Sequence, residues 1–229
     1  DSHNNLPFQC DVKLPTKSFP EEVWLNLTYP LKHQLKSPAV VDFNDSSIIE
    51  SVNVLRWDGF GWWSSNVDGS GFVRVAEYFG ISVASGACLG IIGGGGAARS
   101  TAHTWQTLGG TVKVFGGKRD LGDYDWFNGA EDSDRTCDIL VNFDDDMHPE
   151  DITVTGFCVK SQYHPIDGEH TDRVATVTNK LVDGRWLLAA QHLESWSQLW
   201  APQCRDYLPS LDLLISKLIQ AETTLASYA

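Results

Sequence analysis

The residues from Leu89 to Ser100, LGIIGGGGAARS, carry the strongest chemical signal in this chain. A short apolar run enters four consecutive glycines, and small residues typical of a helix start follow, with Arg99 among them. Glycine lets a strand turn sharply into a helix, and a phosphate can reach the helix N-terminus only where side chains are absent. The pattern predicts a dinucleotide site, with a tight glycine-rich turn as the alternative.

The sequence after the next apolar run bears on which dinucleotide this would be. Thr111 to Phe115 reads as a strand, and the end of this second strand should face the adenosine ribose. No carboxylate ends the strand, as NAD would require, whereas Lys118 and Arg119 suit the 2′-phosphate of NADP. We therefore expect NADP, with NAD less favoured because of the cations. A solvated basic loop is the alternative, and Asp120 supports it.

Four further segments place polar side chains before and after the glycines. Lys32 closes the run NLTYPLK, Asn53 lies in SVNV, Asp68 lies in the glycine turn NVDGSG, and Gln191 ends GRWLLAAQ. Taken singly, each is ordinary, since Lys32 could be a surface lysine and Asp68 a turn former. Their joint order is the informative feature.

In this order the segments resemble the shikimate dehydrogenase family, which reads NVTxPxK, AVNT, NTDGxG, GAGGAAR and GxxMLxxQ. The resemblance covers most of the chain and is strongest from Asn26 to Arg99 and from Gly184 to Trp200. It implies the reversible, NADP-dependent reduction of 3-dehydroshikimate to shikimate, a step of aromatic amino acid biosynthesis. A related dehydrogenase acting on quinate or another polyol acid, and a non-catalytic ligand-binding module, are the alternatives.

The resemblance assigns roles residue by residue. Lys32 aligns with the catalytic lysine and Asp68 with its partner aspartate. This chemistry is sound, because hydride arriving at a ketone carbon leaves negative charge on oxygen, which needs an acid beside it. The expected substrate-binding residues are Asn26, Thr28, Asn53, Gln191 and Tyr163. The expected cofactor-binding residues are Gly93, Gly95, Gly96, Ala97, Arg99, Lys118 and Arg119.

The chain also departs from the family pattern. The two serines of the family's SxSPxxHN segment are missing, and only Ser2-His3-Asn4 resembles its end. The family's Asn-Arg-Thr after the second strand is replaced by Gly116-Gly117-Lys118, and its NATPxGM by NFDDDM at residues 142–147. We expect the three aspartates to form a solvated acidic turn, because charge runs usually face water.

The elements that must position these residues alternate between strand and helix from Ala87 onward, which favours a parallel sheet. Upstream, strands are expected at Phe8–Leu14 and Val23–Leu27, with a hairpin turn at Asp58–Gly61. The expected fold class is α/β, with a Rossmann-like, doubly wound cofactor domain (residues 80–185). A smaller α/β substrate domain (residues 1–79) would be completed by C-terminal helices (residues 186–229). Four helices are expected: Val73–Phe79, Ala97–Leu108, Trp186–Trp200 and Leu208–Leu225.

Composition limits the function classes. The net charge of −13 argues against nucleic acid or an anionic membrane as partner. Five cysteines without a CxxC pair, no long apolar run and no visible signal peptide favour a cytoplasmic protein. We expect no metal, since His164, His170, Asp167 and Glu169 lack ligand spacing. The expected partner is a small-molecule substrate, bound by a monomer or a homodimer.

Overall fold

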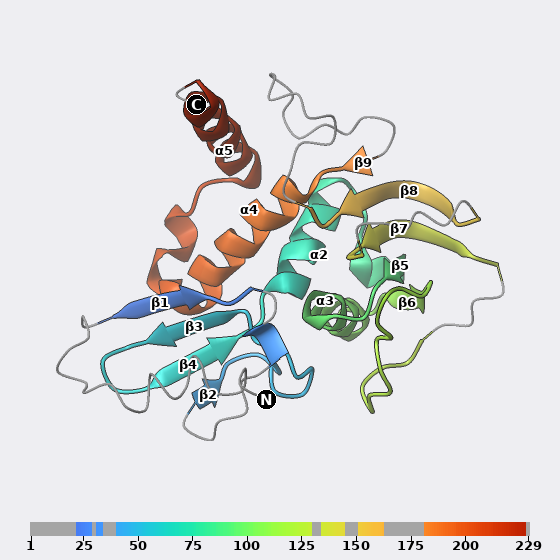
Figure 1. Cartoon of the computed structure of the whole chain (residues 1–229), viewed down its shortest axis with the longest axis horizontal. Helices are drawn as coiled ribbons and strands as arrows, with labels where there is room; N and C mark the ends of the chain where they lie inside the picture. Colours follow the sequence, from blue (N-terminus) through green and yellow to red (C-terminus); the bar gives the residue numbers. More distant parts are fainter. Residues whose placement is uncertain are drawn as a thin grey trace.

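Two β-sheets with helices packed between and beside them make up the fold (Figure 1). The computed structural model describes residues 22–28, 31–33, 40–129, 134–144, 151–162 and 181–227. The expected strand Phe8–Leu14 and the segment Ser2–Asn4 lie outside these ranges, as does Tyr163. Within the described ranges, no helix is long and apolar enough to cross a membrane.

The first sheet is mixed and has the strand order β1-β3-β4-β2. Its strands are β1 (Val23–Asn26), β2 (Val40–Asp42), β3 (Val54–Trp57) and β4 (Trp62–Ser65). β2 runs parallel to β4, and the other neighbours are antiparallel. The expected hairpin turn is confirmed: the Asp58 carboxylate accepts hydrogen bonds from the backbone N–H groups of Phe60 and Gly61, both at 2.9 Å.

The second sheet is parallel throughout and has the order β6-β5-β7-β8-β9. Its strands are β5 (Cys88–Ile92), β6 (Thr111–Val114), β7 (Thr136–Asn142), β8 (Thr153–Lys160) and β9 (Leu181–Val182). The first strand of this sheet in the chain, β5, therefore lies between β6 and β7, so the strand order reverses there as in a doubly wound sheet. The expected Rossmann-like sheet is confirmed. In the described parts of the β6–β7 and β7–β8 connections, however, no helix forms.

The described residues form the α-helices α2 (Asp68–Tyr78), α3 (Gly96–Thr107), α4 (Gly184–Ser195) and α5 (Leu211–Ala226). They correspond to the four expected helices, with shifted ends. The long helix expected to reach Trp200 becomes a π-helical turn, η5, from Trp196 to Trp200. Short 3₁₀ turns lie at η3 (Leu31–His33), η4 (Val83–Ser85) and η6 (Pro202–Tyr207).

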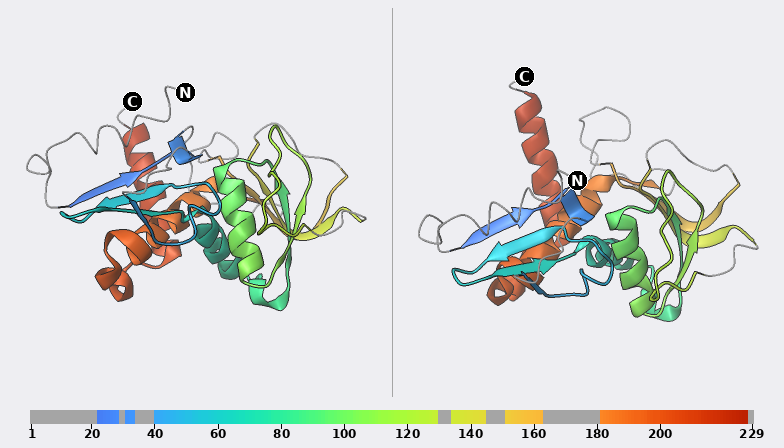
Figure 2. Two further views of the ribbon diagram at one scale, coloured as in Figure 1. Left: turned by 90° about the horizontal axis from the view of Figure 1, so that it is seen from below. Right: turned by 60° about the horizontal axis from the view of Figure 1, so that its bottom comes forward.

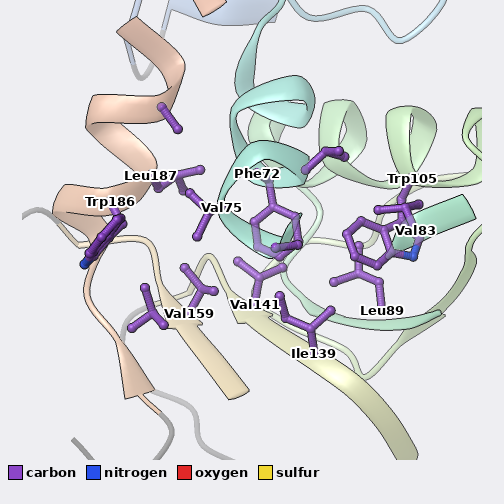
Figure 3. Packing of buried hydrophobic residues seen from close by; sticks show 14 of the residues in the cluster. Phe72, Val75, Val83, Leu89, Trp105, Ile139, Val141, Val159, Trp186 and Leu187 are labelled. Carbon is purple, nitrogen blue, oxygen red and sulfur yellow. The ribbon is translucent and has the colours of Figure 1, made fainter. Parts of the chain in front are cut away.

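The largest apolar core lies between the parallel sheet and the helices (Figure 3). Phe72 and Val75 of α2, Trp105 of α3 and Trp186 of α4 all contribute buried side chains to it. Both α2 and α4 thus pack on the parallel sheet although they follow different sheets in the chain. The helix α2 packs against both α3 and α4 (Figure 2). The division into a substrate domain and a cofactor domain therefore stays a proposal.

Two glycines let α2 approach its neighbours closely. A Cβ on Gly69 would lie 2.2 Å from Thr104 Oγ1 and 2.3 Å from the Ser100 carbonyl oxygen of α3. A Cβ on Gly71 would lie 2.9 Å from the backbone nitrogen of Gln191 in α4. The glycines of NVDGSG thus bring three helices together at the end of α2 that begins with Asp68.

Candidate active site

Lys32 and Asp68 form an ion pair where η3 meets the start of α2. Lys32 Nζ lies 2.6 Å from Asp68 Oδ2, and the Asp68 side chain is 1% exposed against 17% for Lys32. The backbone places the lysine: Leu31 N donates to Thr28 O at 2.8 Å, and Val52 N donates to Lys32 O at 2.6 Å. The backbone of Lys32 is therefore hydrogen-bonded to the segment that precedes β3.

The other carboxylate oxygen of Asp68 accepts two amide hydrogen bonds. Asn53 Nδ2 and Gln191 Nε2 both donate to Oδ1, each at 2.8 Å. Three donors from three elements thus converge on one buried carboxylate, which fixes its orientation. Asp68 is also the first residue of α2, where a negative charge is stabilised by the helix dipole.

Asn53 and Asn66 build the turn that presents Asp68. Asn53 Oδ1 accepts from Val67 N at 2.9 Å, so the Asn53 amide is engaged on both its oxygen and its nitrogen. Asn66 Oδ1 accepts from Asp68 N at 2.9 Å, while Asn66 Nδ2 donates to Ser51 O and Ser51 Oγ. The sequence analysis assigned no role to Asn66 or Ser51. An Asn two residues before a helix start is the signal that could have identified Asn66.

The glycine loop (Gly93–Gly96) reaches this pair from the parallel sheet. Gly93 has φ +105° and donates its N–H to Gly116 O at 2.8 Å. Gly95, the residue before α3, has no side chain that could cap the helix. A Cβ on Gly96 would lie 2.3 Å from Ser51 Oγ and 3.5 Å from Lys32 Cβ. The N-terminus of α3 is therefore in direct contact with the segments that carry the ion pair.

A covering segment (Gly116–Leu121) packs on the glycine loop. A Cβ on Gly94 would lie 2.0 Å from Asp120 O, so only glycine fits there. Lys118 N donates to Asp144 Oδ2, and a Cβ on Gly93 would lie 3.3 Å from that carboxylate's Oδ1. The half-buried Asp144 carboxylate is thus held by a backbone N–H group, and the expectation that residues 144–146 form a solvated acidic turn stays a prediction. Asp145 and Asp146 lie outside the described residues.

Two arginines near the start of α3 have different surroundings. Arg119 Nη2 would lie 3.5 Å from a Cβ on Gly95, which puts its guanidinium at the helix N-terminus. Arg99 is buried and donates to the Tyr124 hydroxyl and to Glu50 O, the latter at 3.0 Å. Uncapped N–H groups and a cation suit a phosphate group, so the residues present fit the pyrophosphate of a dinucleotide.

The remaining expected residues lie at the edge of this arrangement or beyond what is described. Asn26 and Thr28 are exposed, next to Leu27, whose N–H donates to Asn53 O at 2.7 Å. Tyr163 and the group of His164, Asp167, Glu169 and His170 lie outside the described residues. Within the described ranges, no group of His, Cys, Asp and Glu side chains could hold a metal ion.

Comparison with known proteins gives related sequences of one kind. No family model matches the chain. Shikimate dehydrogenase (NADP(+)) of Methylibium petroleiphilum is 35% identical over 74 residues, 32% of this chain but only 25% of that protein. The protein of the same description from Halobacterium salinarum is 26% identical over 203 residues, which cover 78% of this chain and 74% of that protein.

Solved structures share the fold. Shikimate 5-dehydrogenase of Thermus thermophilus, in complex with NADP(H) and shikimate, has a TM-score of 0.61 at 21% identity, covering 88% of this chain and 80% of that one. An Ael1 enzyme from Pseudomonas putida has a TM-score of 0.66 at 18% identity, covering 93% and 83%. The two sheets and the ion pair beside a glycine loop define an α/β protein with the dehydrogenase fold. The chain is similar in sequence to shikimate dehydrogenases and shares the fold of their solved structures.

Proposed function

We propose that this protein reduces a 3-dehydroshikimate-like ketone to the corresponding alcohol with NADPH, reversibly. The observation that carries the proposal is the Lys32–Asp68 ion pair, 2.6 Å between Nζ and Oδ2, set against the N-terminus of α3. Such a reaction needs a proton donor and a helix N-terminus that binds the cofactor phosphates. In this protein Lys32 and the N-terminus of α3 lie next to each other.

The chain's own residues would supply the proton. NADPH, when bound, supplies the hydride that adds to the carbonyl carbon. Lys32 would donate a proton from Nζ to the carbonyl oxygen as negative charge develops there, and regain it from solvent. Asp68 would orient Nζ, because its carboxylate is itself held by Asn53 and Gln191. In the overall reaction, the ketone, NADPH and one proton give the alcohol and NADP(+).

The hydrogen bonds that Asn53 and Gln191 make within the protein limit which of their polar atoms can contact a substrate. The Asn53 oxygen and one of its N–H groups are bonded within the protein, so at most one N–H group can reach a substrate hydroxyl. Gln191 keeps its carbonyl oxygen available as an acceptor for a ring hydroxyl. Asn26, Thr28 and Tyr163 are proposed to shape the pocket by the family resemblance alone.

The cofactor contacts are proposed at the glycine loop. Gly93, Gly95, Gly96 and Ala97 would line the phosphates, with Lys118 and Arg119 as the cations that favour NADP over NAD. Arg99 would act indirectly, because its guanidinium is bonded to Tyr124 and Glu50 and so braces α3. The cofactor unit would span residues 80–185, and the substrate unit residues 1–79 with residues 186–229.

Two alternatives are kept. A related dehydrogenase acting on quinate or another polyol acid would use the same Lys32–Asp68 ion pair. The contact of the covering segment with Gly94 and Asp144 favours a module that no longer binds a cofactor.

A titration with cofactor, followed by an activity assay on a panel of substrates, distinguishes the proposed function from its two alternatives. Tryptophan fluorescence should report saturable NADPH binding, with weaker NADH binding. Lys32→Ala should then lose most of kcat and keep NADPH affinity, whereas Lys217→Ala, on exposed α5, should match the wild type in both. Unchanged kcat in Lys32→Ala would contradict the acid–base assignment, and no binding of either cofactor would favour the non-catalytic module.

A further inference from the structure

Asn44 binds the backbone of Asn66 through both ends of its side-chain amide. Asn44 lies two residues after β2, and Asn66 is the first residue after β4. Asn44 Nδ2 donates to Asn66 O at 2.8 Å, and Asn44 Oδ1 accepts from Asn66 N at 2.9 Å. Because an amide has both a donor and an acceptor, this contact continues the pairing of β2 with β4 by one more residue. The backbone at Asn66 is thereby fixed although both strands have ended.

The backbone at Asn66 determines where Asp68 begins α2. Asn66 Oδ1 accepts from the Asp68 N–H group at 2.9 Å, and Asn66 Nδ2 donates to Ser51. Both ends of the Asn66 side chain and both of its backbone polar groups are therefore hydrogen-bonded, and Asn44 supplies the two backbone contacts. Asp68 Oδ2 in turn lies 2.6 Å from Lys32 Nζ, so the chain of contacts runs from Asn44 to the ion pair.

The loop that carries Asn44 is held in shape by Asp42. Asp42 Oδ1 accepts from Ser46 N at 3.1 Å and from Ser46 Oγ at 2.5 Å, and Asp42 Oδ2 accepts from Ser47 N at 2.8 Å. Asn44 N also donates to Asp42 Oδ1, at 3.4 Å. These hydrogen bonds give the Asn44 side chain a defined direction, which it needs in order to hold a backbone 22 positions away.

We propose that Asn44 is a positioning residue for the Lys32–Asp68 pair: it holds the backbone of Asn66 and so sets the direction in which the Asp68 carboxylate meets Lys32 Nζ. The proposal rests on the proposed function. Asn44 acts through Asn66, because its side-chain hydrogen bonds within the described ranges go to Asn66 and, at 3.5 Å, to Gln198 Oε1. A shift of Asp68 would move the proton donor away from the reacting carbonyl, which lowers the rate more than it weakens substrate binding.

Steady-state kinetics of the purified full chain with 3-dehydroshikimate and NADPH are the first test. Asn44→Ala should lower kcat about tenfold, because a misplacement of about 1 Å can cost about a hundredfold. The KM for both substrates should stay within about twofold of the wild type. Asn128→Ala removes an exposed amide and should match the wild type in kcat and in KM.

The pH dependence of Asn44→Asp separates positioning from a merely structural role. The carboxylate of this variant cannot donate to Asn66 O, whereas its protonated form has a donor and an acceptor, like the amide. The neighbouring Asp42 carboxylate disfavours a second negative charge at this position, which raises the pH at which the new carboxyl takes up its proton. The kcat of Asn44→Asp, relative to the wild type at the same pH, should therefore rise as pH falls from about 8 to about 5.

A purely structural role of Asn44 gives a different result in the same experiment. The folded fraction of Asn44→Asp, followed by circular dichroism, would change with pH, and kcat per folded molecule would equal that of the wild type throughout. That result would overturn the proposal.

A measurement on Lys32 itself needs no turnover. The Lys32 side chain is 17% exposed and bound to Asp68, so formaldehyde and a borane should methylate it slowly. In Asn44→Ala this methylation, followed by peptide mass spectrometry, should become several-fold faster because the carboxylate is no longer held against Nζ. Lys217, on an exposed position of α5, should react alike in both proteins.

The outcomes separate this proposal from the proposed function. A wild type that reduces 3-dehydroshikimate, with Asn44→Ala equal to it in kcat and in Lys32 methylation, overturns the role of Asn44 alone. A wild type with no activity on this ketone contradicts the proposed function, and Lys32 methylation then decides on Asn44. Faster methylation in Asn44→Ala supports the positioning role, and equal methylation overturns it.

Discussion

Gln191 of α4 donates a hydrogen bond to Asp68 Oδ1 of α2 at 2.8 Å, across 123 positions of sequence. The same oxygen accepts from Asn53, so two residues expected to bind substrate hydroxyls each have a hydrogen bond to the carboxylate. A residue bonded in this way can act on the reaction by orienting Asp68 as well as by touching substrate.

The Gln191 contact predicts a loss of stability that does not depend on the proposed reaction. Gln191→Leu keeps most of the side-chain volume but leaves a buried carboxylate oxygen with one donor fewer. The free energy of unfolding should fall by about 1–3 kcal/mol in a urea titration. Gln220→Leu, on an exposed position of α5, should stay within about 0.5 kcal/mol of the wild type. Equal losses in the two variants would show that the Asp68 contact contributes nothing.

The close helix contacts of α2 predict a reversal of the usual effect of alanine. Glycine to alanine inside a helix normally stabilises by about 1 kcal/mol. Gly69→Ala should instead destabilise by about 1–3 kcal/mol, since the added Cβ would meet the Ser100 carbonyl oxygen and Thr104 Oγ1. Gly61→Ala, where nothing lies within 4 Å of the added Cβ, is the control. A stabilised Gly69→Ala protein, measured by chemical unfolding, would refute the close packing of α2 on α3.

The parts of the site that the sequence predicted are those encoded locally. The glycine loop follows a strand and begins a helix, and the segment that begins with Asp68 contains the glycines that let α2 approach its neighbours. The contact between Lys32 and Asp68, 36 residues apart, was expected only through the family resemblance. Local pattern alone does not specify it, because the lysine and the aspartate meet only once the segments around β3 and β4 have folded together.

The features that were missed depend on contacts between distant segments. Engagement of both ends of the Asn53 amide depends on where Val67 and Asp68 lie after the hairpin has folded. The hydrogen bond from Lys118 N to Asp144 depends on the covering segment crossing the glycine loop, which the run of aspartates does not reveal. The short strand β2 pairs in parallel with β4 and has no alternation long enough to reveal it.

Burial of His192 predicts a pH dependence of stability near neutrality. His192 borders an apolar cavity of about 580 Å³ between α4 and α5, and burial lowers the pKa of its imidazole below the ordinary 6.5. Below pH 6.5 the unfolded chain takes up a proton that the folded chain resists, so the free energy of unfolding falls as pH drops, by up to about 1.4 kcal/mol per pH unit.

Urea titrations of the wild type and His192→Leu at pH 7.5 and pH 5.5 measure this effect. Over this range the variant should lose less of its free energy of unfolding than the wild type, because it has no imidazole that takes up a proton on unfolding. The carboxylates are the same in both proteins, so their contribution cancels in the comparison. Equal losses in both proteins would mean that His192 takes up its proton without opening the fold.

The thiols of Cys137 and Cys204 differ in burial, and this difference predicts different rates of alkylation. Burial raises the pKa of the Cys137 thiol in β7 to about 12, whereas Cys204 is exposed in η6. Alkylation requires the thiolate, which at pH 8 is only about one part in ten thousand for a thiol of that pKa. Iodoacetamide should therefore label Cys204 within minutes and Cys137 only as urea opens the sheet, as followed by peptide mass spectrometry. If Cys137 were labelled as fast as Cys204 in native buffer, β7 would not be buried as described. The same strand leads to Asn142 and to Asp144 beside the glycine loop, so their placement would be contradicted as well.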